Sequence, residues 1–160
     1  DMEDAVCVCT PLADLPPEAS GPLARPDTGL FCVFDGHAGD FTSEFLADKC
    51  PSACLSSRAW AERIAKGDQS EEALEALLLE CCERLEAQLR EEPRMQADED
   101  GGKALDNSGS TGVLAVVLDQ HVAVGNVGDS GAALIQYSKA REDIDVRMVT
   151  LEHKPNLPGE

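Results

Sequence analysis

Apolar positions fall into several short, nearly continuous runs along the chain. The central run, residues 30–34, holds five consecutive apolar residues, Leu-Phe-Cys-Val-Phe. It is too short for a helix, and its β-branched and aromatic content favours a strand that is buried on both faces. Similar runs predict strands at residues 5–9, 112–118, 121–127, 132–137 and 146–151. The short breaks between the later runs indicate hairpins and an antiparallel meander.

Helical periodicity predicts a long helix that opens at Ser70 and closes at Pro93. One stripe of this helix is apolar and consists of Leu74, Leu77, Leu78, Cys81, Leu85 and Leu89. Two i, i+4 ion pairs are expected on the other side, Glu80 with Arg84 and Glu86 with Arg90. The apolar stripe indicates a helix that packs on the core.

A shorter helix is predicted after the central strand. Asp40 is its N-cap, the helix extends to about residue 48, and Pro51 ends it or begins another short element. Residues 11–28 and 91–106 lack periodicity and are predicted to be surface loops.

Strands that are apolar on both faces require cover on both. A sheet packed against a second sheet, with helices outside, meets this requirement best. The sequence therefore predicts an α+β fold in which two antiparallel sheets form a sandwich flanked by helices. At 160 residues, the chain has the length of one domain.

Charge narrows the classes of partner. The net charge is −18, so long-range repulsion opposes binding to nucleic acid or to an anionic membrane surface. No apolar run approaches the roughly 18 residues that a membrane span needs, and the N-terminus lacks the pattern of a signal peptide. We expect a soluble protein, although a chain that starts at Asp1 has no initiator Met and leaves the loss of a leader open.

Seven cysteines contain no C-x-x-C pair, and several lie in predicted strands or in the long helix, where they act as small hydrophobic residues. Buried thiols in a reducing compartment are therefore expected. This favours the cytosol or the nucleus.

The end of the central strand carries the candidate chemistry. Asp35, Gly36 and His37 follow it directly and combine an oxygen ligand, a flexible backbone and a proton-transfer group. In a purely structural interpretation, Asp35 bonds its own loop and His37 caps the next helix. Glu3 and Asp4, before the first strand, are either a solvated entry or face a bound cation. His121 in a strand and His153 in a turn are interpreted as structural.

Five motifs occur together and in order, and their combination resembles the metal-dependent type 2C protein serine/threonine phosphatases. The motifs are Met2-Glu3-Asp4, Val33-Phe34-Asp35-Gly36-His37-Ala38-Gly39, Ser108-Gly109-Ser110-Thr111-Gly112, Asn126-Val127-Gly128-Asp129-Ser130 and His153-Lys154-Pro155. Each motif is weak alone, whereas five in this order are specific and run the length of the chain.

The resemblance implies a four-layer α-β-β-α sandwich and a serine/threonine phosphatase. It implies that Asp35 bridges two Mg²⁺ or Mn²⁺ ions, with the Gly36 carbonyl as a further ligand. Glu3 and Asp4 would hold metal-bound waters, and Asp129 would help to bind a third, weaker ion. A water between the ions would attack the phosphorus of phosphoserine or phosphothreonine, and His37 would protonate the leaving alkoxide.

Physical chemistry is consistent with these roles. Oxygen ligands suit Mg²⁺ or Mn²⁺ rather than zinc. Two neighbouring divalent cations lower the pKa of a bound water and neutralise the charge of a phosphate. The unperturbed pKa of histidine, about 6.5, suits acid catalysis near neutral pH.

Three departures from the family motifs, Ala38 for Gly, Gly131 for Arg and Glu152 for Asp, remove no expected metal ligand. The family's phosphate-binding Arg and two later metal aspartates have no counterpart here. Residues 1–160 are therefore expected to be one catalytic domain that is incomplete at both ends and monomeric when complete. The alternative is an inactive relative that serves as a binding or scaffold module. Retention of the motif residues argues against that alternative, and the order of the motifs argues against an unrelated acidic cation-binding protein.

Overall fold

The structure is a computed structural model of the chain. It describes residues 2–10, 28–96, 106–119, 121–140 and 142–154. Most of the two predicted loops, at 11–27 and 97–105, lies outside the described residues.

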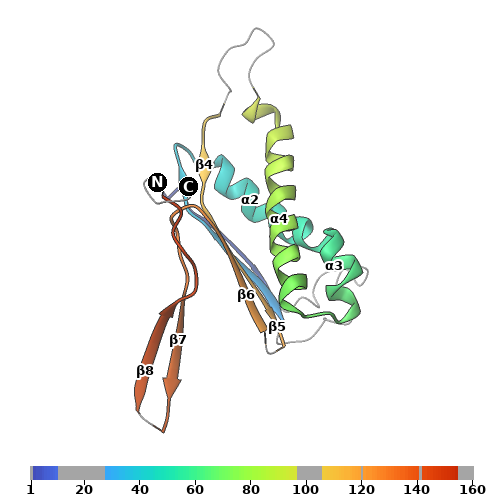
Figure 1. Ribbon diagram of the computed structural model, residues 1–160. Helices are drawn as coiled ribbons and strands as arrows, with labels where there is room; N and C mark the ends of the chain where they lie inside the picture. The colour runs from blue at the N-terminus through green and yellow to red at the C-terminus, as the bar shows by residue number, and fades with distance from the viewer. Residues whose placement is uncertain (1, 11–27, 97–105, 120, 141, 155–160) are drawn as a thin grey trace.

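A four-stranded antiparallel sheet organises the described residues (Figure 1). Its spatial order is β1 (Ala5–Cys9), β2 (Gly29–Phe34), β5 (Gly112–Leu118) and β6 (His121–Val127). The strands predicted at residues 5–9, 30–34, 112–118 and 121–127 are confirmed, as is the β5–β6 hairpin.

In β1, β2 and β5, more buried side chains alternate with more exposed ones along the strand. In β2, Phe31 and Val33 are 38% and 49% exposed, while the residues between and beside them are buried. The register places the exposed Val8 beside Phe31 and the exposed Val6 beside Val33. The prediction that β2 is buried on both faces is therefore wrong for the described residues, because helices cover only one of its apolar faces.

The α-helices of the described residues lie together on one side of the sheet (Figure 1). They are α2 (Phe41–Leu55), α3 (Arg58–Glu62) and α4 (Glu71–Glu91), and short 3₁₀ turns follow at Ile64–Lys66 and Pro93–Met95. The long helix predicted after Ser70 is confirmed. Helix α3 was not predicted, since five residues are too few to show periodicity. Its local signal is Ser57, whose Oγ accepts the Trp60 N–H over 3.0 Å.

Helix α2 continues through Pro51 to Leu55. The predicted end near residue 48, with Pro51 ending the helix or beginning another short element, is therefore wrong. Proline removes a backbone donor and typically costs about 3 kcal/mol inside a helix. The last turns bury Cys50, Ala53 and Cys54 in the core, and this packing offsets the cost. Asp40 occupies the N-cap position, but its side chain makes no capping hydrogen bond.

Of the two predicted ion pairs on α4, one forms. Arg90 Nε lies 2.7 Å from Glu86 Oε1. Glu80 Oε2 instead accepts the backbone N–H of Ala59 over 3.0 Å. That N–H belongs to the first turn of α3 and has no partner within its own helix. A hydrogen bond from it to the Glu80 carboxylate is therefore more favourable than an ion pair with the exposed Arg84.

Cysteines make up much of the core between the sheet and the helices. None of the seven forms a disulfide, as predicted, and the buried ones are Cys7, Cys32, Cys50, Cys54 and Cys81. The sulfur atoms of Cys32 in β2 and Cys50 in α2 are 3.4 Å apart. Cys50 also lies 4.0 Å from the Cys81 sulfur in α4, so thiols connect the sheet to both long helices.

Strands β7 (Ala133–Ser138) and β8 (Asp143–Met148) form a separate antiparallel hairpin, which extends away from the helices and the main sheet (Figure 1). The predicted meander is therefore wrong, because β7 pairs with β8 and not with β6. A turn with Gly128 at φ +91° separates the hairpin from β6. Asn126 Nδ2 holds this turn by donating to Gly128 O over 3.0 Å and to Leu151 O over 2.8 Å.

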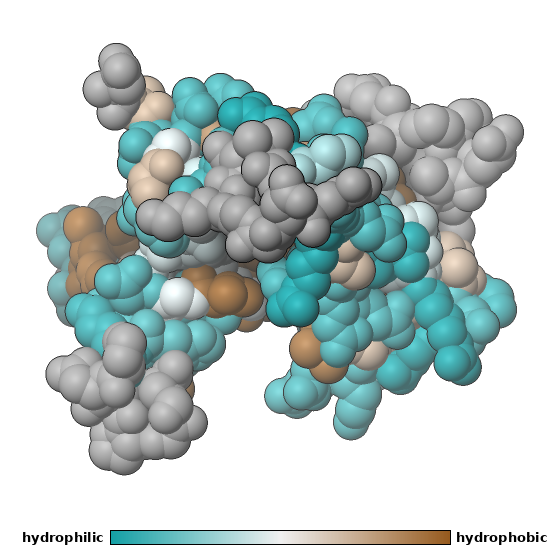
Figure 2. All heavy atoms as spheres, turned by 90° about the horizontal axis from the view of Figure 1, so that it is seen from above, coloured by the Kyte–Doolittle hydropathy of each residue, from teal (hydrophilic) through white to brown (hydrophobic). Residues whose placement is uncertain are grey.

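Seen from above, most of the molecular surface drawn in colour is hydrophilic, with apolar side chains in a few separate patches (Figure 2). Within the described ranges, no helix has the length and hydropathy that crossing a membrane requires.

Candidate metal and catalytic site

The candidate carboxylates stand at the adjacent ends of β1 and β2. Ala5 pairs with Phe34 in the antiparallel register, and Asp4 and Asp35 each lie one residue beyond this pair. Both side chains belong to exposed residues. The register thus places two carboxylates that are 31 positions apart in the sequence at adjacent strand ends.

Gly36 and Glu3 approach each other closely. A Cβ atom at Gly36 would collide with the backbone carbonyl of Glu3 and would lie 2.8 Å from Ser43 Oγ. Ser43, at the start of α2, donates its hydroxyl hydrogen bond to the same Glu3 carbonyl and lies 2.9 Å from Asp40 O. Residue 36 must therefore be glycine, because the Glu3 backbone and Ser43 leave no room for a side chain there.

A left-handed turn after His37 binds the Glu3 side chain. Ala38 has φ +59° and Gly39 has φ +129°. The Gly39 N–H donates to Glu3 Oε1 over 3.1 Å. One carboxylate oxygen of Glu3 is therefore engaged by the loop that carries His37.

Two-residue strands hold His37. Strand β3 (Gly36–His37) pairs with β4 (Gly109–Ser110), and His37 stands opposite Gly109. A Cβ atom at Gly109 would lie 2.5 Å from Cε1 and 2.6 Å from Nε2 of the His37 ring. The imidazole therefore occupies the space that a side chain at position 109 would need.

Thr111 connects the Asp35 segment to the turn that carries Asp129. Its backbone N–H donates to Asp35 O over 2.9 Å, and its Oγ1 lies 2.7 Å from Ser130 Oγ. Asp129 is exposed, next to Ser130. These contacts join four of the five motifs at one end of the sheet, and the fifth joins them through the His153 N–H, which donates to Gly128 O over 2.9 Å.

The sequence reasoning missed a network of hydrogen bonds that supports β4. Ser108 Oγ accepts the Thr42 N–H over 3.1 Å, and the two hydroxyl oxygens are 2.8 Å apart. Asp106 Oδ1 accepts the Ser108 N–H over 2.8 Å, and Asp106 Oδ2 lies 2.9 Å from an amino group of Arg94. Hydrogen bonds from Ser108 and the nearby Arg94 charge lower the pKa of Asp106. The available signal was the Asp106-Asn107-Ser108 sequence, which is typical of a side chain bonding the backbone two residues on.

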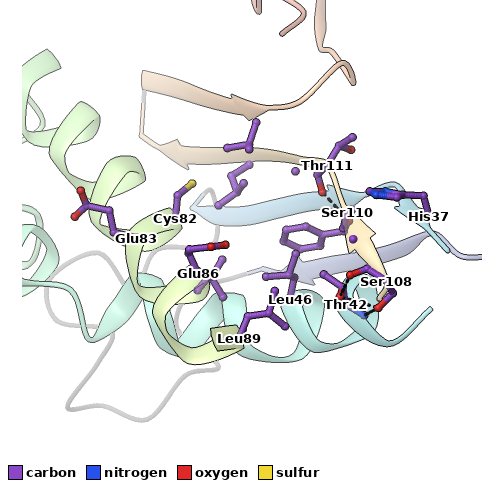
Figure 3. Close-up of a pocket in the computed structure, with 16 residues that line it drawn as sticks. His37, Thr42, Leu46, Cys82, Glu83, Glu86, Leu89, Ser108, Ser110 and Thr111 are labelled. Carbon is purple, nitrogen blue, oxygen red and sulfur yellow. Dashed lines mark hydrogen bonds between the residues drawn. The ribbon is translucent and has the colours of Figure 1, made fainter. Parts of the chain in front are cut away.

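A cavity of about 590 Å³ lies beside His37, between α2, α4 and the start of β5 (Figure 3). Its walls include Phe34, Leu46 and Leu89, with His37 on one side. Asp35, Glu3 and Asp129 are not among its lining residues. The apolar walls do not suit a charged ligand, so the candidate site is at the strand ends and not in this cavity.

The other histidines have different surroundings. His121 Nδ1 in β6 lies 3.1 Å from Gln69 Oε1. The backbone N–H of His153 donates to Gly128 O over 2.9 Å.

The donors at the strand ends fit Mg²⁺ or Mn²⁺ in kind, since all are carboxylate or carbonyl oxygens. They do not form a full set. In the part of the chain that the structure describes, no group of three or more His, Cys, Asp or Glu side chains is arranged to hold a metal ion. The described residues therefore offer oxygen donors at the strand ends but no complete set of ligands for a metal ion.

Comparison with known proteins matches these features to one family. Residues 1–160 match the family model described as Protein phosphatase 2C. All of the chain aligns with protein phosphatase 2C 53 of Oryza sativa subsp. japonica, at 29% identity and over 37% of that relative. The integrin-linked kinase-associated serine/threonine phosphatase 2C of Bos taurus is 25% identical over 97% of the chain and 39% of its own length. The chain spans less than half the length of these relatives.

A solved structure shows the same architecture. The serine-threonine phosphatase 2C from Toxoplasma gondii matches 99% of the chain and 48% of its own, with a TM-score of 0.76 and 27% identity. This similarity confirms the predicted fold class, an α+β arrangement of antiparallel sheets and helices, of which the chain contains a part. The chain belongs to the protein phosphatase 2C family.

Proposed function

We propose that this protein is a metal-dependent phosphatase that hydrolyses phosphoserine and phosphothreonine in proteins. The observation that carries the proposal is the position of Asp35, Gly36 and His37. They follow the end of β2, beside the Glu3 segment and β4, in a chain that matches the phosphatase 2C family throughout.

Asp35 would bridge two ions, the Gly36 carbonyl would be a further ligand, and Glu3 and Asp4 would complete the outer shell. Asp129 would contribute to a third, weaker site. Mutual repulsion supports this assignment, because carboxylates at adjacent strand ends destabilise each other unless a cation compensates their charge. When bound, divalent cations neutralise a phosphate and activate water at neutral pH.

His37 would donate a proton from its ring to the alkoxide oxygen of the leaving serine or threonine. Such acid catalysis contributes roughly 10²- to 10⁴-fold to a rate. The β3–β4 pairing supports this role, since it fixes the backbone of His37 next to Asp35.

The proposal includes the partners, the oligomeric state and the compartment of the protein. Its partners are phosphoproteins, it acts as a monomer when complete, and residues 1–160 form one part of a single catalytic domain. The seven cysteines, none of which forms a disulfide, support a reducing compartment, the cytosol or the nucleus. The net charge of −18 supports the exclusion of nucleic acid as a partner.

The test is hydrolysis of a phosphoserine peptide by the full-length protein, with Mn²⁺ and after chelation. We expect turnover that requires the metal. Metal binding without turnover would instead favour the inactive binding module.

A further inference from the structure

Gly109 lies directly under the His37 ring. The two residues face each other across the β3–β4 pair, and opposite residues in an antiparallel pair project to the same side. The ring fills the space above the Gly109 Cα, since a Cβ atom there would lie 2.5 Å from Cε1 and 2.6 Å from Nε2. Separations this short are impossible for real atoms, so a side chain at position 109 and the ring cannot share this place.

The backbone around Gly109 is held from both sides. On the N-terminal side, the buried Ser108 bonds Thr42 in α2, with 2.9 Å from Thr42 Oγ1 to Ser108 O. On the C-terminal side, Ser110 Oγ donates to Asp35 O over 3.2 Å, and the Thr111 N–H donates to the same oxygen over 2.9 Å. These bonds hold the Gly109 backbone in place, so it cannot move away from an added methyl group.

The His37 ring can change its position more easily than the Gly109 backbone. His37 is exposed, and no hydrogen bond of its ring is recorded among the described residues. Figure 3 shows the ring beside the strand that carries Ser110, on the edge of the cavity. An added methyl group would thus displace the imidazole and leave the surrounding fold in place.

We infer that Gly109 is a positioning residue for catalysis: because it has no side chain, the His37 ring can take the place above it from which the ring would donate a proton. The inference rests on the proposed function, in which His37 protonates the leaving alkoxide. A displacement of about 1 Å from the productive geometry can cost about 10²-fold in rate. The glycine of this motif is then required by the ring and not by its own backbone conformation, which lies outside the positive-φ region.

The experiment compares Gly109→Ala with the parent full-length protein on two substrates. We expect kcat for a phosphoserine peptide to fall by about 10²-fold. The rate for an aryl phosphate should change little, because a phenolate leaves without a proton. Adding Gly109→Ala to His37→Ala should cause no further loss, since the ring through which Gly109 acts is already absent.

The matched control is Gly125→Ala in β6. A Cβ atom there would lie 3.6 Å from Leu78, an ordinary contact, so the same methyl group should leave both rates unchanged. Proton NMR gives a readout that is independent of turnover. In the parent we expect nuclear Overhauser effects between the Gly109 α-protons and the His37 ring, and in Gly109→Ala we expect altered ring chemical shifts with the remaining spectrum preserved.

The outcomes separate the two ideas. If His37→Ala selectively slows the phosphoserine peptide but Gly109→Ala behaves like Gly125→Ala, the positioning role is wrong and the proposed function stands. Equal losses of Gly109→Ala on both substrates, or additive losses in the double variant, would also overturn the positioning role. A parent protein that hydrolyses neither substrate would overturn the proposed function, and the catalytic role of Gly109 with it.

Discussion

Gly39 donates its backbone N–H to Oε1 of Glu3 over 3.1 Å, although the two residues are 36 positions apart in the sequence. This bond connects the start of the first strand to the loop after His37. The loop reaches Glu3 only by way of a left-handed turn, in which Ala38 adopts φ +59°.

Ala38→Gly should therefore stabilise the protein. A left-handed conformation costs an L-residue about 1–2 kcal/mol, and glycine adopts it freely. After subtraction of the larger entropy of unfolded glycine, we expect the free energy of unfolding to rise by about 0.5–1 kcal/mol. Urea unfolding of the full-length protein measures this change. Ala87→Gly, in the exposed part of α4, is the control and should lose about 1 kcal/mol. A similar loss of unfolding free energy in both variants would contradict the left-handed conformation of Ala38.

Asp35→Asn should abolish Mn²⁺-dependent hydrolysis of a phosphopeptide while the circular dichroism spectrum stays that of a folded protein. The proposed bridging carboxylate supplies charge to both ions, and an amide does not. Asp48→Asn, on the exposed side of α2, is the matched control and should retain activity. Activity of Asp35→Asn within a few-fold of the parent would exclude the bridging role.

His37→Ala should slow a phosphoserine peptide far more than an aryl phosphate. The serine alkoxide needs a proton to leave, and general acid catalysis is worth roughly 10²- to 10⁴-fold. His121→Ala, which removes a histidine bonded to Gln69, should change neither rate. Equal losses of His37→Ala on both substrates would identify a structural histidine.

Asp106→Asn should destabilise the protein in a pH-dependent manner. Hydrogen bonds from Ser108 and the nearby Arg94 lower the pKa of Asp106 in the folded state, so its ionised form stabilises the fold at neutral pH. This contribution is complete above the unfolded pKa, about 3.9, and disappears as the pH falls through the lower folded value. The gap in urea midpoint between parent and variant should therefore shrink as the pH falls below the unfolded pKa. A gap that is independent of pH would mean that the Asp106 charge makes no contribution. Glu86→Gln, in an exposed ion pair, is the control and should show a smaller gap throughout.

A polypeptide of residues 1–160 should associate in solution and bind Mn²⁺ weakly. The exposed apolar side chains of β1 and β2 favour association, and the described residues offer no complete set of ligands for a metal ion. Sedimentation and calorimetry test this against the full-length protein, which we expect to be monomeric and active. The prediction would be wrong if the polypeptide of residues 1–160 were monomeric, bound two ions tightly and turned over substrate.

The sequence predicted those elements whose signal is local. The β1 bounds agree with the prediction to the residue, because an apolar run flanked by carboxylates and Pro11 has clear ends. Helix α4 was equally clear from its apolar stripe. The end of α2 was missed because the burial of Cys50 and Cys54 against other elements outweighs the local effect of Pro51.

The sequence named candidate site residues but not the contacts that hold them in place. Order of motifs identified Asp35, Gly36 and His37, and the register of β1 with β2 then placed Asp4 beside them. The contact between Gly109 and His37 depends on a pairing across 72 positions, which no local pattern reveals. Apolar runs also could not distinguish a strand covered on both faces from one whose second face is open in the described residues.

The buried thiols determine whether this protein can recover from unfolding. In the native state, five of the seven cysteines lie in the core and are shielded from oxidants. Once the core opens, these thiols become accessible and can combine into non-native disulfides, which trap the chain. Heat inactivation should therefore be irreversible in air, and refolding should require a reductant throughout.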